Sequence, residues 1–176
     1  MRVIVMLVLA GLTCSAFGQQ GTVVVDPKRN YTVKSEGEIY NGFDREYPEY
    51  ADTTTADLNF NNSDWINIHF AKANFAGDTL QILVYETNPA FHHQYRISII
   101  DNKFFIYYEF RTSGENVKRI ARTLESKLIL NTLDFKKGKE IRGYTEYKGE
   151  CIDDCWSEPI SIRGNFKVII PGPPIR

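Results

Sequence analysis

Residues 93–110 constrain the fold of this chain more than any other part of the sequence. Two runs of alternating apolar and polar residues, 93–100 and 103–110, flank the pair Asp101-Asn102. Because an Asp-Asn pair can supply the two positive φ angles of a type I′ turn, the runs are expected to form an antiparallel hairpin. This turn places the apolar residues of both runs on one face, and a slip of one residue would mix the two faces. The expected cross-strand pairs are His93 with Phe110, Tyr95 with Tyr108, Ile97 with Ile106 and Ile99 with Phe104.

The same period of two recurs along most of the chain and predicts further strands. Gly164 interrupts the last of these runs, which indicates a bulge or close packing at that point. Because no helices alternate with the strands, the sequence predicts an all-β fold, an antiparallel β-sandwich of about 8–10 strands. A closed β-barrel is the alternative. The alternating runs cover residues 65–70, 79–84, 127–135, 139–147 and 160–170, with short edge strands at 23–26 and 31–34.

Residues 115–124 are the one segment with a helical pattern. Its apolar residues recur at helical spacing, and Ser113 precedes it as a cap. A helix of about ten residues is marginal alone, so we expect it to dock on the sheet. The residues on its apolar face are Val117, Ile120, Ala121 and Leu124.

Residues 1–18 have the organisation of an export signal. Arg2 supplies the positive start, residues 3–12 form an uncharged apolar run, and residues 16–18 place small residues where a signal peptidase cleaves. The apolar run is shorter than the about 20 residues that a membrane span needs. We therefore expect cleavage before Gln19 and a periplasmic or extracellular protein.

The composition supports one packed domain over residues 19–170. Hydrophobic residues make up 43% of the chain and aromatic residues 13%, which is enough for a sizeable core. The proline-rich residues 171–176 end the fold as an extended tail. A net charge of −1 gives no reason to expect a nucleic-acid partner. After the signal, no apolar run is long enough for a membrane span.

Cys151 and Cys155 are the cysteines that remain after removal of the signal. Two cysteines close together in an exported chain predict a disulfide that closes a small loop. A zinc site is the competing interpretation, but it would need ligands from His69, His92 or His93, which lie far away in the sequence. We predict the disulfide and no metal site.

The chain lacks the common signatures of catalysis. It has no Gly-x-Ser-x-Gly nucleophile motif and no glycine-rich phosphate loop. Its carboxylates are numerous, but spacing singles out no pair of them. The sequence therefore predicts neither catalytic residues nor a cofactor.

Residues 36–57 form a long segment without a clear strand pattern, in which aromatic and acidic residues alternate with glycine and proline. Loops of this length in compact domains are usually functional or mobile, and tyrosines on a polar loop make good contact residues. Packing of these rings over an open end of the sandwich is the alternative. The candidate binding residues are Tyr40, Phe43, Tyr47 and Tyr50.

Phe105 and Tyr107 form a second candidate binding surface. They lie on the face of the predicted hairpin that should be polar, together with Arg96, Lys103 and Glu109. Such a patch suits sugar rings or a partner protein. The alternative is that the helix predicted at residues 115–124 covers it.

The leader ends Phe17-Gly18-Gln19-Gln20, which resembles the leaders of exported proteins from Bacteroidota. Residues 135–144 (FKKGKEIRGY) resemble strand-turn-strand segments of the uncharacterised secreted β-domain proteins of that phylum. The resemblance implies an exported β-protein and supplies neither an activity nor functional residues.

These observations favour an exported, non-enzymatic binding protein with a protein or a glycan as its partner. One alternative is a carboxylate-dependent hydrolase that acts on glycans, and another is a lipocalin-like carrier of a small ligand. Two converging acids in a concave site would favour the hydrolase, and a wide internal cavity would favour the carrier. A filled core with an exposed aromatic patch would favour partner binding.

Overall fold

The computed structural model describes residues 20–33, 55–61, 67–85, 91–112, 119–152 and 159–171, and within these ranges it contains strands and no helix. The predicted signal and nearly all of the tail lie outside these ranges. The strands are β1 (Gly21–Thr22), β2 (Val24–Val25), β3 (Ala56–Phe60), β4 (Asn67–Ile68), β5 (Phe70–Ala76), β6 (Thr79–Tyr85), β7 (Phe91–Ile100), β8 (Lys103–Thr112), β9 (Arg119–Leu130), β10 (Glu140–Cys151) and β11 (Ile160–Ile169).

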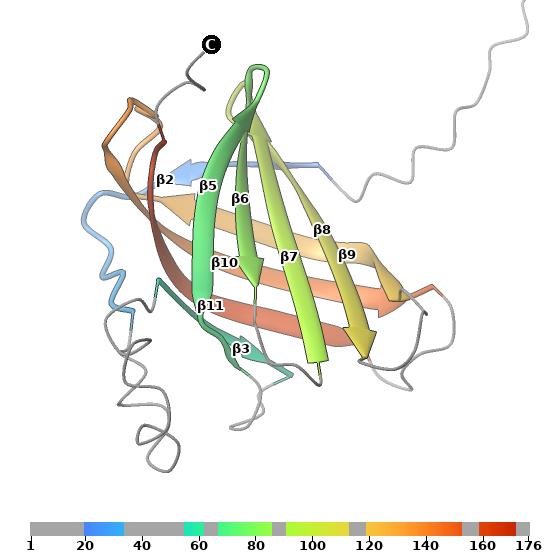
Figure 1. The fold of residues 1–176 in the computed structure, drawn as a ribbon. Coiled ribbons are helices and arrows are strands. Elements are labelled where there is room, and N and C mark those ends of the chain that lie inside the picture. Colours follow the sequence, from blue (N-terminus) through green and yellow to red (C-terminus); the bar gives the residue numbers. More distant parts are fainter. Residues whose placement is uncertain are drawn as a thin grey trace, which may run out of the picture.

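All these strands belong to one sheet, in the order β4-β3-β11-β10-β9-β8-β7-β6-β5, with β1 beside β8 and β2 beside β9. The described neighbours are antiparallel, except that β2 and β9 are parallel. β4 and β5 stand at opposite ends of this order, yet only His69 separates them in the chain. The sheet therefore curls until its ends meet, and in Figure 1 β5–β8 form a front wall behind which β9–β11 cross steeply. The all-β class is confirmed, in the nearly closed, barrel-like form of the predicted alternative.

Hydrogen bonds join the two ends of the sheet. The backbone N–H groups of Thr55 and Ala56 donate to the His69 carbonyl at 3.0 and 2.8 Å. The Thr55 hydroxyl accepts a hydrogen bond from the Ala71 N–H at 2.6 Å and donates one to the Ala71 carbonyl at 3.0 Å. The Lys167 N–H donates to the Thr55 carbonyl at 2.7 Å. Thr55 thus links the start of β3 to β5 and to β11.

β7 and β8 form the hairpin that the sequence predicts. All four expected pairs are present, and Ile97 lies opposite Ile106 with both side chains buried. Asp101 and Asn102 have φ angles of 48° and 62°, the positive values that a type I′ turn requires. Turn chemistry and burial therefore agree on one register.

The helix predicted at residues 115–124 is wrong over its described part, because residues 119–124 begin strand β9. Lys148 of β10 pairs with Glu125, and Gly149 pairs with Thr123. Leu124 is therefore the extra residue of a β-bulge, and its side chain is 41% exposed. The bulge interrupts the alternation of buried and exposed residues in β9. The apolar residues on either side of it therefore recur at a spacing that resembles that of a helix.

Aromatic rings from opposite walls meet inside the sheet. The Tyr147 ring of β10 lies 5.6 Å from the ring of Tyr95 on β7 and 6.2 Å from that of Tyr108 on β8. The Phe60 ring of β3 lies 6.0 Å from that of Tyr108. The Tyr95 hydroxyl hydrogen-bonds to the Thr145 hydroxyl at 2.7 Å. At this level the interior is filled by side chains, as is common in barrels of about eight strands.

The N-terminal segment occupies a gap between β8 and β9. These two strands pair only over Tyr108–Phe110 and Arg119–Ala121. Where they separate, β1 pairs with β8 and β2 pairs with β9. Val23, between β1 and β2, donates its N–H to the Asn102 carbonyl at 2.9 Å, and its side chain is 7% exposed within the core. The edge strand predicted at residues 23–26 is thus an inserted strand.

Candidate functional site

The outer surface of the sheet has a hollow on each wall. The rear hollow spans β9, β10 and β11 and has a volume of about 430 Å³. The front hollow spans β5, β6 and β7 and has a volume of about 360 Å³. Both volumes lie in the lower part of the range of small-ligand sites.

Strand register arranges the outward side chains of the front wall in rows that cross β5, β6, β7 and β8 in turn. The middle row passes through the front hollow, and the rows beside it supply amide groups and aromatic rings. The middle row is Lys72, Leu83, Arg96 and Tyr107, and the flanking rows are Asn74, Gln81, Ser98 and Phe105, and Phe70, Tyr85, Gln94 and Glu109.

The two cations of the front hollow lie over tyrosine rings. The Lys72 Nζ is 5.0 Å from the ring centroid of Tyr85, and the Arg96 Cζ is 5.8 Å from that of Tyr107. Both distances allow cation–π attraction, which positions the cations beside the hollow. Glu109, at the edge of this wall, is buried and paired with Arg111 at 3.1 Å.

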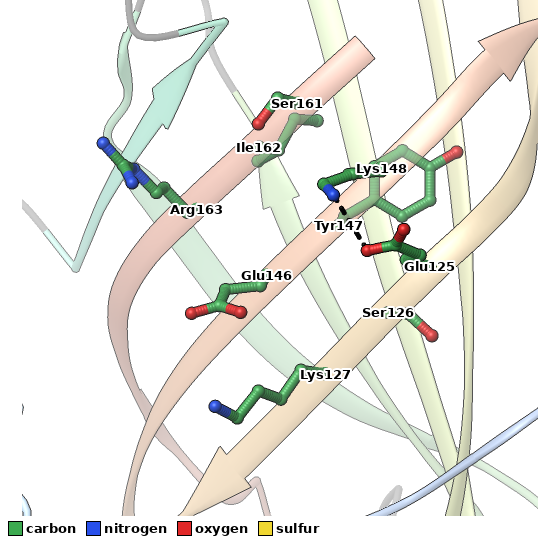
Figure 2. Close-up of a pocket in the computed structure, with 9 residues that line it drawn as sticks. All are labelled: Glu125, Ser126, Lys127, Glu146, Tyr147, Lys148, Ser161, Ile162 and Arg163. Atoms are coloured by element: carbon green, nitrogen blue, oxygen red, sulfur yellow. Dashed lines mark ion pairs between the residues drawn. The ribbon is translucent and has the colours of Figure 1, made fainter. Parts of the chain in front are cut away.

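The rear hollow is lined by charged side chains. Glu146 of β10 lies in register with Lys127 of β9 on one side and with Arg163 of β11 on the other. Figure 2 shows Glu146 between these two cations, and beside them an ion pair of 2.9 Å between Lys148 and Glu125. The outward charges of this hollow therefore alternate across the strands.

Tyr144 connects the rear hollow to the N-terminal segment. Its hydroxyl donates a hydrogen bond to Glu146 Oε1 at 2.6 Å, and the Arg29 Cζ lies 3.9 Å from its ring centroid. Partial burial, together with the hydrogen bond to Glu146, raises the pKa of Tyr144 above its ordinary value. The Tyr144 hydroxyl thus binds the Glu146 carboxylate, and Arg29 packs on the ring of Tyr144.

The structure describes some of the predicted site residues. Tyr40, Phe43, Tyr47 and Tyr50 lie outside the described residues. Phe105 and Tyr107 lie on the outer face of β8 and are half-buried. The helix that was the alternative cover for Phe105 and Tyr107 is absent over residues 119–124, which belong to β9 instead. Cys151 ends β10 and Cys155 lies outside the described residues, so their disulfide stays a prediction.

Neither of the two hollows has the features that the alternative functions would need. Two acids do line the rear hollow, but Glu125 is ion-paired and exposed, and Glu146 is exposed between two cations. A glycosidase needs one carboxylic acid that burial keeps protonated. A carrier needs internal space, and the rings of Tyr95, Tyr108 and Tyr147 occupy the interior at their level.

The histidines do not converge on a metal site. His92 hydrogen-bonds to Gln94 on the outer face at 2.7 Å, whereas His93 is buried and its Nδ1 lies 2.7 Å from the Tyr108 hydroxyl. Within the described ranges, no group of three or more His, Cys, Asp or Glu residues could hold a metal ion.

No family model, no curated protein and no solved structure matches this chain. Over the part of the chain that the structure describes, no helix is long and apolar enough to cross a membrane.

Sequence reasoning missed both hollows. Alternation identifies Lys72, Leu83 and Arg96 as outward residues, but only the pairing of β5, β6 and β7 shows that they are neighbours. For Lys127, Glu146 and Arg163 the register depends on the long connections from β9 to β10 and from β10 to β11. No short turn motif in the sequence predicts that register, whereas Asp101-Asn102 predicts the register of β7 and β8.

Proposed function

We propose that this protein is an exported, non-enzymatic glycan-binding protein and that the front hollow is its binding site. The observation that carries the proposal is the row Lys72, Leu83, Arg96 and Tyr107, which joins an apolar floor, two cations and an aromatic ring on one outer wall. The leader predicted at residues 1–18 supports the exported location.

The chemistry of the front hollow suits a sugar. The C–H face of a pyranose is apolar and packs on side chains such as Leu83 and on aromatic rings such as that of Tyr107. The hydroxyl groups at its edge hydrogen-bond to amides and cations, which Asn74, Gln81 and Arg96 supply around the hollow. A hollow of about 360 Å³ is large enough for a few sugar units.

A protein partner would use the same wall in a different way. Phe70, Tyr85, Phe105 and Tyr107 are types of residue that concentrate at protein interfaces. A protein partner would bury the whole wall, whereas a glycan would depend on the hollow. The two partners therefore respond differently to changes in the polar residues of the hollow.

Affinity electrophoresis tests the proposal. The exported protein is run through native gels that contain soluble starch, galactomannan, xyloglucan or hydroxyethylcellulose, and retardation reports binding. We expect retardation by at least one of these neutral glycans. The Tyr107→Ala and Asn74→Ala variants should each weaken it by about tenfold, which is about 1.4 kcal/mol. Tyr144→Ala changes a tyrosine on the rear wall and is the matched control.

Three results would contradict the proposal. The first is that no neutral glycan retards the protein. The second is that Tyr107→Ala and Asn74→Ala bind as tightly as Tyr144→Ala while all three remain folded. The third is release of a reducing sugar from the retarding glycan, which would show an enzyme.

A further inference from the structure

We propose that the rear hollow is a second binding site and that it takes an acidic saccharide. The site is independent of the front hollow, because it lies on the other wall and uses other residues. We call the outward side chains of β9, β10 and β11 the basic face, and the proposal rests on their charges.

The carboxylates of the basic face are nearly all neutralised by cations of the same face. Three ion pairs account for Glu125, Glu140 and Glu150. The pairs are Lys148–Glu125 at 2.9 Å, Arg142–Glu140 at 2.6 Å and Arg122–Glu150 at 2.5 Å. The fourth carboxylate, Glu146, has cations on both sides.

Three cations of the basic face are left without an ion pair among the described residues: Lys127, Arg163 and Lys167. All three are exposed. Lys127 and Arg163 lie in register with Glu146, one on each side, whereas Lys167 lies in register with Arg142. Across the edge with β3, Asp57 lies opposite Asn165, which is two residues from both Arg163 and Lys167. The whole chain has a net charge of −1, so this excess of positive charge is local. A local basic surface on an acidic chain attracts anionic groups over about 8–10 Å at moderate ionic strength.

The spacing of the cations indicates two anionic groups on the ligand. Lys127 and Arg163 lie on strands either side of β10, and neighbouring strands are about 4.8 Å apart. Their backbones are therefore about 10 Å apart. A chain with repeated carboxylates can pair with both cations without drawing their side chains together over Glu146.

Glu146 selects for a saccharide among the anionic polymers. A carboxylate between the two cations repels an acidic peptide, whose side chains offer it no hydrogen-bond donor. A sugar hydroxyl donates to a carboxylate, and the Tyr144 hydroxyl, on whose ring Arg29 packs, already orients Glu146 with a hydrogen bond of 2.6 Å. The ligand that satisfies both the cations and Glu146 carries carboxylates and hydroxyls together, as a uronic-acid polysaccharide does.

The lining of the hollow argues against a protein partner. Ser126, Ser161 and charged side chains make up most of its lining residues, as Figure 2 shows. Large protein interfaces have an apolar core of exposed aromatic or aliphatic residues. Within the described residues of β10 and β11, Ile169 is the one large apolar side chain that is exposed, and it does not line the hollow.

Affinity electrophoresis through polygalacturonate gels tests this site, with poly-glutamate and dextran sulfate as competing polyanions. We expect polygalacturonate to retard the protein. The double variant Lys127→Gln/Arg163→Gln should lose about tenfold or more in affinity. The double variant Lys103→Gln/Lys137→Gln makes the same change in net charge away from the basic face and should bind as the parent does.

Glu146→Gln separates a saccharide site from a simple cationic patch. The change removes a negative charge, so binding of poly-glutamate and dextran sulfate should strengthen. Binding of polygalacturonate should weaken, because the charged hydrogen-bond acceptor for its hydroxyls is lost. Stronger binding of all three polymers would overturn the saccharide assignment and leave only electrostatic attraction.

The outcome is also separable from that for the front hollow. Tyr107→Ala should leave polygalacturonate binding unchanged, and Lys127→Gln/Arg163→Gln should leave neutral glycan binding unchanged. If Lys127→Gln/Arg163→Gln and Lys103→Gln/Lys137→Gln lose equal affinity for polygalacturonate, net charge alone governs binding and the rear hollow is not a site.

Discussion

Thr55 shows how one side chain can complete a sheet. Its hydroxyl both accepts from the N–H and donates to the carbonyl of Ala71, so it replaces the ladder partner that β5 lacks at this point. Thr55→Val keeps the shape of the side chain and leaves both Ala71 groups without this partner. We expect the free energy of unfolding in urea to fall by about 1–3 kcal/mol. Thr55→Ser keeps the hydroxyl and should lose less; equal losses would show that the hydroxyl is not what closes the sheet.

The buried tyrosines predict a loss of stability in alkali. Burial raises the pKa of Tyr95 and Tyr108 well above the ordinary value, and it raises the pKa of Tyr147 to about 12. In the unfolded chain these groups ionise near pH 10. Their contribution to stability is therefore complete below about pH 10 and is lost as the pH rises through the folded pKa values.

Urea unfolding between pH 8 and pH 11.5 measures this dependence. The free energy of unfolding should decline above about pH 10, and Tyr147→Phe should make the decline shallower because one titrating group is removed. The absorbance of tyrosinate from these residues should appear together with unfolding. Ionisation of the whole tyrosine complement in the folded protein at pH 11 would disprove the assigned burial.

Among the elements, the inserted N-terminal strand gives the clearest test. Val23 is 7% exposed in the gap between β8 and β9, and its neighbour Val24 is 49% exposed. Val23→Asp buries an unpaired carboxylate, so it should cost about 2 kcal/mol or more. Val24→Asp should change stability by less than about 0.5 kcal/mol. Hydrogen exchange should also show faster exchange of the β2–β9 amides in Val23→Asp, and similar melting temperatures for both variants would contradict the insertion.

The elements differ in how far the sequence predicts them. The hairpin of β7 and β8 is predicted to the residue, because Asp101-Asn102 and the buried face specify the same register. Close packing at Gly164 is also confirmed, since a Cβ there would overlap the carbonyl of Asp57 on β3. The helix at residues 115–124 fails because the bulge at Leu124 depends on β10, which lies far along the chain.

At the scale of the whole molecule, alternation identifies the buried face of each strand but not the path of the sheet. A sandwich and a barrel with the same strands share this alternation, and what distinguishes them here is the bend at His69 between β4 and β5. The hollows were beyond prediction for the same reason. Their residues are adjacent only after several registers are combined, whereas Phe105 and Tyr107 could be identified within a single hairpin.

The predicted disulfide between Cys151 and Cys155 can be tested on the whole chain. Cys151 ends β10, and Cys155 lies four positions later in the sequence, before β11 begins at Ile160. A bridge over so short a loop should stabilise the fold by only about 1–2 kcal/mol. Mass spectrometry of the unreduced, exported protein should show a mass about 2 Da below that of the reduced chain and no alkylatable thiol. Full alkylation without reduction would rule out the bridge.

The position of the N-terminal segment between β8 and β9 has a consequence for the timing of folding. Gly21 pairs with Phe104 and Val25 pairs with Leu130, so the first part of the chain to be synthesised meets partners that appear much later. Contacts so distant along the chain form slowly, after hairpins such as that of β7 and β8. The leader predicted at residues 1–18, while still joined to Gln19, would hold residues 21–25 at the translocation pore and leave the gap beside β8 open. We therefore expect release of the leader, and not the end of synthesis, to time the last step of folding.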